Sequence, residues 1–305
     1  MEIVIAIVQM VLLVAVAPLI SGTARWITAK MQTRQGPPVL QDYYDIVKLL
    51  KRQDVSSKDT SFVHRFMPLL YVGCMLVILL GLPIITRESP IPPLADAILI
   101  VYLLALPRFF FSLASIDTSG AYAGTGGIRE LLIGVLVEPA LMLSLFVAAL
   151  ACGSTNIGII GSEVGSFTSS CPVAMVVAAV AFAVACYIEM GKLPYDLAEA
   201  EQEIQEGPLQ EYSGPSLATM KVGMTLKQIV VASLFIAVFI PFGSAVDMQP
   251  LSLLLGLVFY VIKLAVVFLI CSFVENLVSR VRFKLVGHQT WLVVGISALS
   301  LVFCV

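Results

Sequence analysis

Carboxylates are concentrated in one short part of this chain, the segment from Glu189 to Gly214. It holds seven of the twenty Asp and Glu residues of a sequence that is 59% hydrophobic. Four of its carboxylates follow one another at intervals of three, four and three residues: Asp196, Glu199, Glu203 and Glu206. This spacing predicts that all four lie on one face of a helix. Neighbouring carboxylates titrate as a coupled set with some pKa values raised, so the face is predicted to hold and relay protons. A solvated acidic loop is the alternative.

Ionisable side chains also occur within the apolar stretches, where they are rare and usually line a water path or pair with each other. Glu138 is followed by Pro139, which removes a backbone donor and leaves carbonyl groups and water beside the carboxylate. We expect Glu138 to lie on a proton path, with structural pairing as the alternative. Lys263 lies twelve residues into an apolar segment, too deep to reach either surface easily. We expect it to act in proton transfer, unless it forms a fixed ion pair that positions two helices.

Other kinds of chemistry find little support in the sequence. No two of the six cysteines have CxxC spacing, so an iron-sulfur cluster is not expected. Cys152 and Cys171 flank one loop, where they either pack as small apolar residues or form a bridge. The glycine-rich segment 120–129 lacks the lysine of a phosphate-binding loop. His64 and His288 are isolated, and no metal site or catalytic triad is predicted.

The elements that position these residues are membrane helices. With a mean hydropathy of +0.99 and 12% charged residues, the chain is far more apolar than a soluble domain. A helix needs about 20 mostly apolar residues to span a bilayer. Eight segments meet this requirement: 3–21, 67–86, 94–115, 130–151, 172–190, 222–242, 251–274 and 289–305. The sequence therefore predicts an all-α, polytopic membrane protein with one domain over residues 1–305.

The distribution of basic residues predicts the orientation, because lysine and arginine crowd into cytoplasmic loops. Sixteen of the eighteen are expected on one side, in loops at about 22–66 and 189–221 and in the shorter loops there, including Arg108 and Lys227. Arg87 falls on the opposite side, and Lys263 lies within a span. Eight spans then place both termini outside the cytoplasm.

An amphipathic helix is predicted in the first of these loops, over Val39 to Arg52, where apolar residues recur at helical spacing after the Gly36-Pro37-Pro38 breaker. Two roles remain open for it. It either anchors the loop on the membrane surface or provides a docking surface for a cytoplasmic subunit.

Two loop motifs resemble one family. Arg34-Gln35-Gly36-Pro37 with Leu40-Gln41, Asp45 and Lys48-Leu49 is similar to the RxGP...LQ...D..KL signature of the quinone-site membrane subunit of respiratory complex I and its hydrogenase relatives. Pro194-Tyr195-Asp196-Leu197, the glutamates that follow and Glu211-Tyr212 resemble that family's PFDL.E.E.E...EY.G loop. The resemblance covers essentially the whole chain, and it implies the same eight-helix fold.

Further motifs resemble the hydrogenase branch of this family. Asp117-Thr118, the glycine-rich run, Arg129-Glu130 and Glu138-Pro139 are similar to a pattern in the membrane subunits of group 4 [NiFe]-hydrogenase complexes, the formate hydrogenlyase subunit 4 and hydrogenase-4 component C type. Gly191-Lys192 replaces the asparagine-arginine pair that usually precedes PFDL, and the first loop is short. Both departures put quinone binding in doubt.

The resemblance implies a membrane-anchoring and ion-coupling subunit of a hydrogen-evolving complex in the bacterial inner membrane. Its expected partners are the [NiFe]-hydrogenase large subunit, the iron-sulfur small subunit, an antiporter-like membrane subunit and the lipid bilayer, but no nucleic acid. The nickel-iron and iron-sulfur centres are expected in those partners, with no cofactor or redox centre in this chain. The alternatives are a quinone-site subunit of a complex I-like dehydrogenase and a stand-alone secondary transporter.

The resemblance also implies roles for individual residues. The ion-coupling candidates are Glu138, Glu189, Asp196, Glu199, Glu201, Glu203, Lys263, Glu130 and Asp117. The docking-loop candidates are Arg34, Gly36, Pro37, Gln41, Asp45, Lys48, Arg129, Glu211 and Tyr212.

Overall fold

The computed structural model describes residues 2–57, 60–168, 170–246 and 249–304, with the side chain of Glu201 left out. Within these ranges, eight helices are long and apolar enough to cross a membrane. They are α1 (Glu2–Met31), α3 (Phe62–Gly81), α4 (Ala97–Asp117), α5 (Ala121–Cys152), α7 (Pro172–Glu189), α9 (Gly214–Phe239), α10 (Pro250–Leu277) and α11 (Phe283–Val302). Each overlaps one predicted span, so the predicted all-α membrane fold is confirmed.

Five short elements connect the long helices: α2 (Gln41–Leu50), η1 (Pro92–Ala95), α6 (Ile157–Gly165), α8 (Glu201–Ile204) and η2 (Gly207–Glu211). The first of these is the predicted amphipathic helix, which is confirmed by α2. In the described part of the chain, two isolated β-bridges are the only extended pairing.

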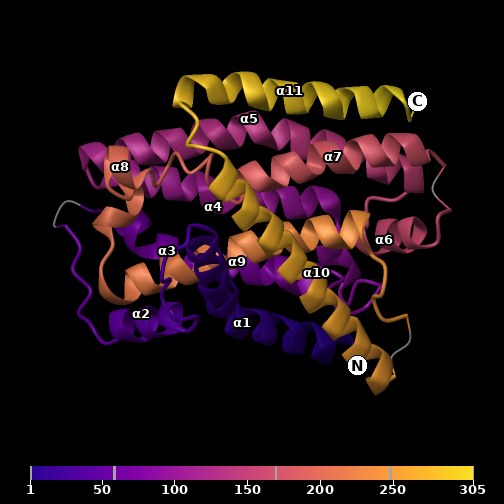
Figure 1. The fold of residues 1–305 in the computed structure, drawn as a ribbon, viewed down its shortest axis with the longest axis horizontal. Coiled ribbons are helices and arrows are strands. Elements are labelled where there is room, and N and C mark those ends of the chain that lie inside the picture. The colour runs from indigo at the N-terminus through magenta and orange to yellow at the C-terminus, as the bar shows by residue number, and fades with distance from the viewer. Residues whose placement is uncertain (1, 58–59, 169, 247–248, 305) are drawn as a thin grey trace.

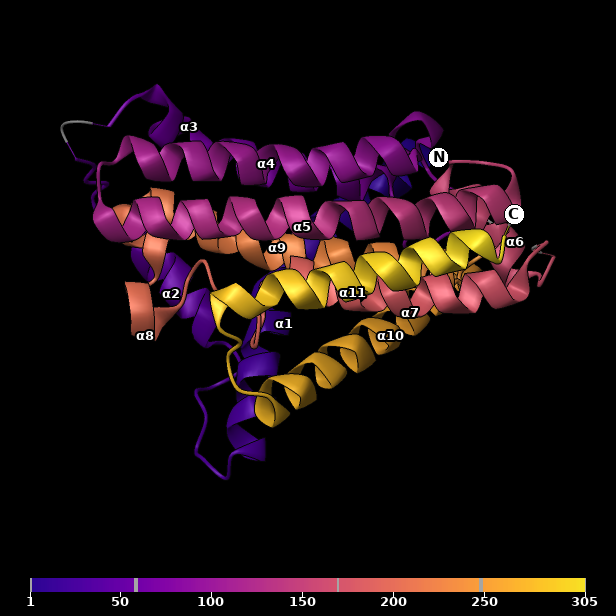
Figure 2. The same cartoon turned by 90° about the horizontal axis from the view of Figure 1, so that it is seen from above.

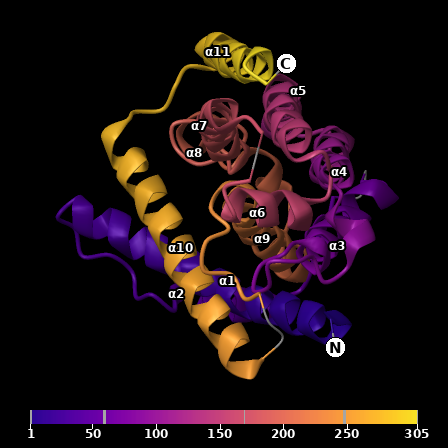
Figure 3. The same ribbon diagram turned by 90° about the vertical axis from the view of Figure 1, so that its right-hand side faces the viewer.

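Helix α9 lies at the centre of the bundle, surrounded by the other long helices (Figure 3). Its most apolar 18-residue window is 67% buried, the highest share among the eight, whereas the corresponding share of α10 is 22%. Helices α4, α5 and α11 run nearly parallel, and α10 is inclined across the bundle (Figure 2). A helix that is buried on all sides needs no polar face, and α9 is apolar around most of its circumference.

The bundle has two chemically different ends (Figure 1). We call the one that contains α2, α8 and residues 190–213 the loop end, and the one that contains α6 and residues 82–96 the opposite end. Both chain termini lie at the opposite end (Figure 1). The prediction that the loop end faces the cytoplasm remains a prediction.

We call the segment from Glu189 to Gly214 the acidic block. Beyond the end of α7 it does not form the predicted helix, so the prediction that Asp196, Glu199, Glu203 and Glu206 share one helical face is wrong. Residues 191–200 are irregular, and α8 is only four residues long. Gly191 has a φ of +64° after the end of α7, and positive φ values at Gln205 and Glu206 end α8. The four carboxylates therefore point to different surroundings, and tertiary contacts decide the role of each.

Candidate functional site

A buried cluster of charged side chains joins four of the long helices. Arg108 of α4 is 5% exposed, and its guanidinium group contacts carboxylates from α5 and α7. Its Nη1 lies 2.9 Å from Glu138 Oε1, its Nε lies 3.6 Å from Glu130 Oε1, and its Nη2 pairs with Glu189 Oε2. Arg108 lies about 13 Å from the end of α4 at 1.5 Å per residue, so these contacts are deep within the bundle.

Lys227 of α9 completes the cluster. Its Nζ lies 3.3 Å from Glu130 Oε1 and 3.2 Å from Glu189 Oε1. Glu130 and Glu189 thus contact both cations, whereas Glu138 contacts Arg108. Three carboxylates facing two cations leave one negative charge in excess. An uncompensated charge is costly in a low dielectric, and Glu138, the one carboxylate of the three that contacts a single cation, is also the most exposed, at 34%.

Glycine makes room for the arginine. Gly134 lies one helical turn from both Glu130 and Glu138 on α5, and a Cβ atom at this position would overlap the Arg108 side chain. The guanidinium group is held by three carboxylates, so it is not free to swing away. The glycine is therefore part of what positions the cluster.

We expect Gly134→Ala to destabilise the protein by about 1–3 kcal/mol, because the added methyl group displaces Arg108 from its carboxylates. Gly124→Ala is the matched control in the same helix, since a Cβ there meets nothing within 4 Å. That variant should be as stable as the original or slightly more so. Thermal unfolding in detergent measures both. Equal unfolding temperatures for the two variants would contradict this role of Gly134.

Sequence reasoning missed both cations of the cluster, because Arg108 and Lys227 were expected in loops. The structure places them within α4 and α9, at 5% and 8% exposure, so that prediction was wrong. Their positions inside the predicted spans 94–115 and 222–242 were the available signal. An ionisable residue within a span is a candidate for a buried pair by default.

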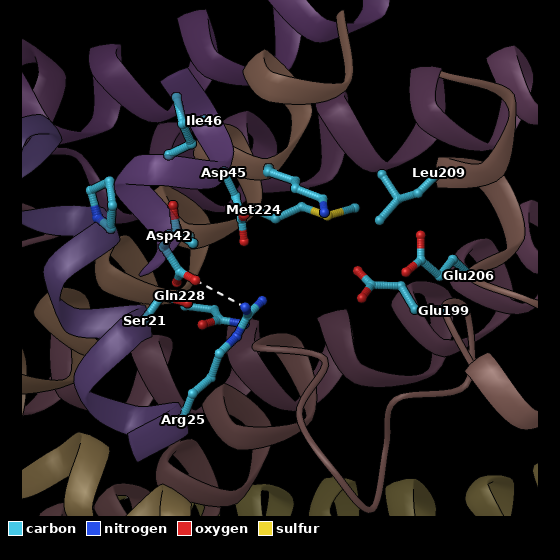
Figure 4. Close-up of a pocket in the computed structure, with 13 residues that line it drawn as sticks. Ser21, Arg25, Asp42, Asp45, Ile46, Glu199, Glu206, Leu209, Met224 and Gln228 are labelled. Carbon is cyan, nitrogen blue, oxygen red and sulfur yellow. Dashed lines mark hydrogen bonds and ion pairs between the residues drawn. The ribbon is translucent and has the colours of Figure 1, made fainter. Parts of the chain in front are cut away.

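A cavity of about 190 Å³ opens at the loop end, between α1, α2, α9 and the acidic block. Figure 4 shows Arg25, Asp42 and Asp45 on one side of it and Glu199 and Glu206 on the other. Arg25 Nη1 donates a hydrogen bond to Asp42 Oδ1 at 2.9 Å (Figure 4). With Lys221 also in its wall, the cavity is lined by charged groups of both signs, and such a lining favours water. We call this space the charged cavity.

Glu199 connects the charged cavity to the buried cluster. It also lines a second cavity of about 60 Å³, which Glu130 and Lys227 border as well, and Met224 and Gln228 are shared by both cavities. Burial raises the pKa of Glu199 to about 8, and the negative charges of Asp196, Glu130 and Glu206 act in the same direction. A carboxyl group with this pKa gains and loses a proton near neutral pH.

Three ion pairs fix the loops of this end. Arg280 Nη2 lies 2.8 Å from Asp196 Oδ2, and Lys192 Nζ lies 3.0 Å from Glu275 Oε1. Arg129 Nη1 lies 2.7 Å from Glu203 Oε2, but the Glu203 side chain is 50% exposed. Glu203 is thus separated from the cluster and lies at the surface, where an ion pair contributes little stability.

Two further ion-coupling candidates lie outside the cluster. Asp117 accepts hydrogen bonds from the backbone N–H and hydroxyl of Ser61, both at 2.7 Å, and so ties α4 to the start of α3. Lys263 donates to the carbonyl of Ile240 at 2.7 Å, where α9 ends. A cation is favourable at the C-terminal end of a helix dipole, which gives Lys263 a partner other than a carboxylate. The Glu201 side chain lies outside the described residues.

The docking-loop candidates separate into three surroundings at the loop end. Arg34, Gly36 and Pro37 line an open groove of about 460 Å³ together with Lys192 and Glu275. Gln41 donates to Asp45 within α2 at 3.0 Å, while Lys48 lies on the exposed basic side of that helix. These residues share one end of the bundle, and they are spread over its surface.

The remaining docking-loop candidates have structural contacts. Tyr212 is buried, stacks on His64 at 4.1 Å and donates to the His64 carbonyl at 3.2 Å. Glu211 lies against Gly120, where a Cβ atom would overlap its carboxylate. Arg129 reaches the Leu197 carbonyl at 3.4 Å in addition to Glu203. Tyr212 thus joins the end of the acidic block to α3.

Neither a metal centre nor a disulfide is present in the described ranges. No group of three or more His, Cys, Asp or Glu side chains there is arranged to hold a metal ion. All six cysteines, each of them in a described range, are free thiols, including Cys152 and Cys171.

Curated relatives match nearly the whole chain. Hydrogenase-4 component C of Escherichia coli is 47% identical over 98% of this chain and 94% of its own length. Formate hydrogenlyase subunit 4 of the same organism is 45% identical over 99% and 98%. NADH-quinone oxidoreductase subunit 8 of Rhodothermus marinus is 29% identical over 75% and 70%.

The fold has a counterpart of known structure. A chain of the membrane-bound sulfane sulfur reductase, an archaeal respiratory membrane complex, superimposes with a TM-score of 0.86 at 22% identity, with full coverage of both chains. The family model described as NADH dehydrogenase matches residues 3–305. The resemblance inferred from the loop motifs is thus confirmed, and with it the similarity to the hydrogenase branch. The chain belongs to the NADH dehydrogenase family, as a multi-pass membrane subunit similar to those of hydrogenase-4 and formate hydrogenlyase.

Proposed function

We propose that this chain anchors a formate hydrogenlyase-type, hydrogen-evolving complex in the bacterial inner membrane and couples its redox chemistry to ion movement. The observation that carries the proposal is the continuous series of ionisable groups from the loop end into the bundle. It runs from the charged cavity through Glu199 to Glu130 and Lys227, and then through Glu189 and Arg108 to Glu138. The hydrogenase large subunit and the iron-sulfur small subunit would dock on the loop end and supply the nickel-iron and iron-sulfur centres.

The coupling is electrostatic in this proposal. Reduction of a centre docked near the loop end attracts a proton, and Glu199 is the group there that exchanges one near neutral pH. A proton that reaches the cluster neutralises its excess carboxylate. Glu138 is the acceptor that fits, because it is paired with Arg108 alone, whereas Glu130 and Glu189 each contact both cations.

The exposure of Glu138 supports a partner within the membrane. Its side chain is 34% exposed, on a face of α5 where Leu132 and Val135 are 43% and 59% exposed. A carboxylate that faces hydrocarbon is costly, so a protein surface is the expected neighbour. An antiporter-like membrane subunit that covers this face would receive the proton from Glu138.

The Glu138→Gln variant tests the coupling. Within the assembled complex in sealed vesicles, we expect hydrogen evolution to continue while the ion movement that accompanies it falls by about 100-fold, because the amide cannot carry the proton. Glu88→Gln, an exposed carboxylate at the opposite end, is the matched control and should leave coupling unchanged. Co-purification of the partner subunits shows that each variant assembles. Normal ion movement in an assembled Glu138→Gln complex would refute the proposed coupling.

A quinone-site function is the second candidate, because the charged cavity lies between the two loops that the family resemblance singles out. Its volume of about 190 Å³ is below the 300–1,000 Å³ of typical ligand pockets, and its wall is highly charged. These properties favour water over a quinone ring. Protection of the assembled complex from thermal unfolding by a quinone analogue would support the second candidate, and absence of binding would remove it.

A further inference from the structure

Three of the six cysteines gather at the opposite end of the bundle. Cys152 is the last residue of α5, Cys171 directly precedes α7, and Cys304 follows α11. In the sequence, Cys152 and Cys171 flank one loop and were the pair considered for a bridge. The structure brings Cys304, more than 130 residues along the chain, to the same place.

Cys171 and Cys304 are neighbours. The Cys171 thiol donates to the Cys304 carbonyl at 3.7 Å, and the two side chains are close enough to interact directly. Both pack against one small apolar cluster formed by Val147, Ala174 and Ala178. Each of the two cysteines is partly exposed. Their positions at the ends of α7 and α11 favour access from the adjacent aqueous phase.

The surroundings of Cys152 are different. It is buried at 8% exposure, and its thiol lies beside the Glu163 carboxylate. Burial restricts the access of reagents to this thiol. Cys152 is thus the least reactive of the three thiols and a suitable internal control.

We infer that Cys171 and Cys304 form a thiol oxidation site, at which a disulfide links the beginning of α7 to the end of α11. The oxidant is a disulfide of the thiol-exchange class. The thiolate of one cysteine attacks the oxidant and releases one of its thiols, and the second cysteine then attacks the resulting mixed disulfide and releases the other. Two thiols of this chain lose two electrons and two protons in total, and the oxidant is reduced to two thiols.

The position of the site supports oxidation there. Outside the buried positions within the spans, most basic residues lie at the loop end, whereas Arg87 lies in residues 82–96 at the opposite end. By the positive-inside rule, the opposite end then faces the compartment outside the cytoplasm, where disulfides persist. This assignment is independent of the proposed ion coupling, because it rests on the distribution of charge in the loops.

The bond would restrain a helix at the periphery of the bundle (Figure 3). Helix α11 is among the less buried spans, at 28% of its most apolar window, and it packs on α5 and α7 along one side. A link from Cys304 to the start of α7 would fix the C-terminal end of α11. We expect the oxidised protein to unfold at a higher temperature than the reduced protein, because the cross-link restricts the unfolded chain.

Mass spectrometry of the assembled complex tests the inference. Membranes are quenched with acid, free thiols are blocked with N-ethylmaleimide, and the protein is digested without reductant. We expect a cross-linked peptide that joins Cys171 to Cys304 and disappears after reduction with dithiothreitol. It should be absent from Cys171→Ser and from Cys304→Ser, but present in Cys152→Ser. Addition of oxidised glutathione to reduced membranes should restore it.

Two outcomes would overturn the inference. One is recovery of both residues as maleimide adducts even after treatment with oxidised glutathione. The other is a cross-link that joins Cys152 to either residue. Both readouts use the original protein, so they remain decisive even where a serine variant fails to assemble.

Discussion

Replacement of Arg108 by methionine is expected to destabilise the protein by about 3–5 kcal/mol, the typical cost of removing one partner from a buried ion pair. The guanidinium group contacts Glu130, Glu138 and Glu189, and the Glu189 side chain is only 2% exposed. Without Arg108, Glu138 would lose its ion pair and Lys227 would remain as the cation of the cluster, so at least one carboxylate must take up a proton or be reached by water. The amount of protein in the membrane and its unfolding temperature in detergent measure the loss.

Three further variants test the contribution of the charge. Arg108→Lys keeps the cation and should retain part of the stability, although the ammonium group cannot form the same forked contacts. Arg52→Met removes an exposed arginine from the loop end and should change stability by less than about 0.5 kcal/mol. Addition of Glu189→Gln to Arg108→Met should recover stability, because it removes one uncompensated charge. An Arg108→Met protein as stable as Arg52→Met would show that the cluster contributes nothing.

Glu199→Gln is expected to remove a pH dependence that the native protein has. The folded pKa of Glu199, about 8, lies above its ordinary value of 4.5. Between these two values the folded protein holds a proton that the unfolded chain has lost, so the free energy of unfolding falls as pH rises through this interval. Glutamine does not ionise. The unfolding temperature of the variant, relative to the original, should therefore rise as pH increases from about 5 to 8.

Coupled ion movement should also respond to this variant. In the assembled complex, the rate of coupled ion movement should change with pH around a midpoint near 8. This pH dependence should disappear in Glu199→Gln and persist in Glu199→Asp. Glu88→Gln is the control, because Glu88 is an exposed carboxylate at the opposite end and lines neither the charged cavity nor the second cavity. Infrared difference spectroscopy with a pH step measures the protonation state of the Glu199 carboxyl group directly. A Glu199 that is ionised throughout this pH range would contradict the prediction.

Most of the fold was predictable from the sequence. Each of the eight spans is a run of consecutive apolar residues, and the length of such a run decides whether it crosses a bilayer. The amphipathic helix was predictable for a similar reason, because the spacing of apolar residues between Val39 and Arg52 is a local property. The sequence also identified Glu130, Glu138 and Glu189 as candidates.

The acidic block shows where local spacing was insufficient. Asp196, Glu199 and Glu203 have helical spacing, yet Asp196 pairs with Arg280, Glu203 pairs with Arg129, and Glu199 borders both cavities. The cations come from helices and loops far away in the sequence. Gly191 and Pro194 at the start of the segment lower its helix tendency, so tertiary contacts decide the path of the chain.

The sequence by itself determined the number of membrane helices, the family and the carboxylates available for ion transfer, because each depends on residue type and on spacing along the chain. Only the tertiary structure decided that Arg108 and Lys227 face three of those carboxylates, that Glu199 links two cavities and that Lys263 contacts a helix end instead. The physical reason is that ion pairing inside the bundle depends on which helices are neighbours. Packing settles that arrangement between segments far apart along the chain.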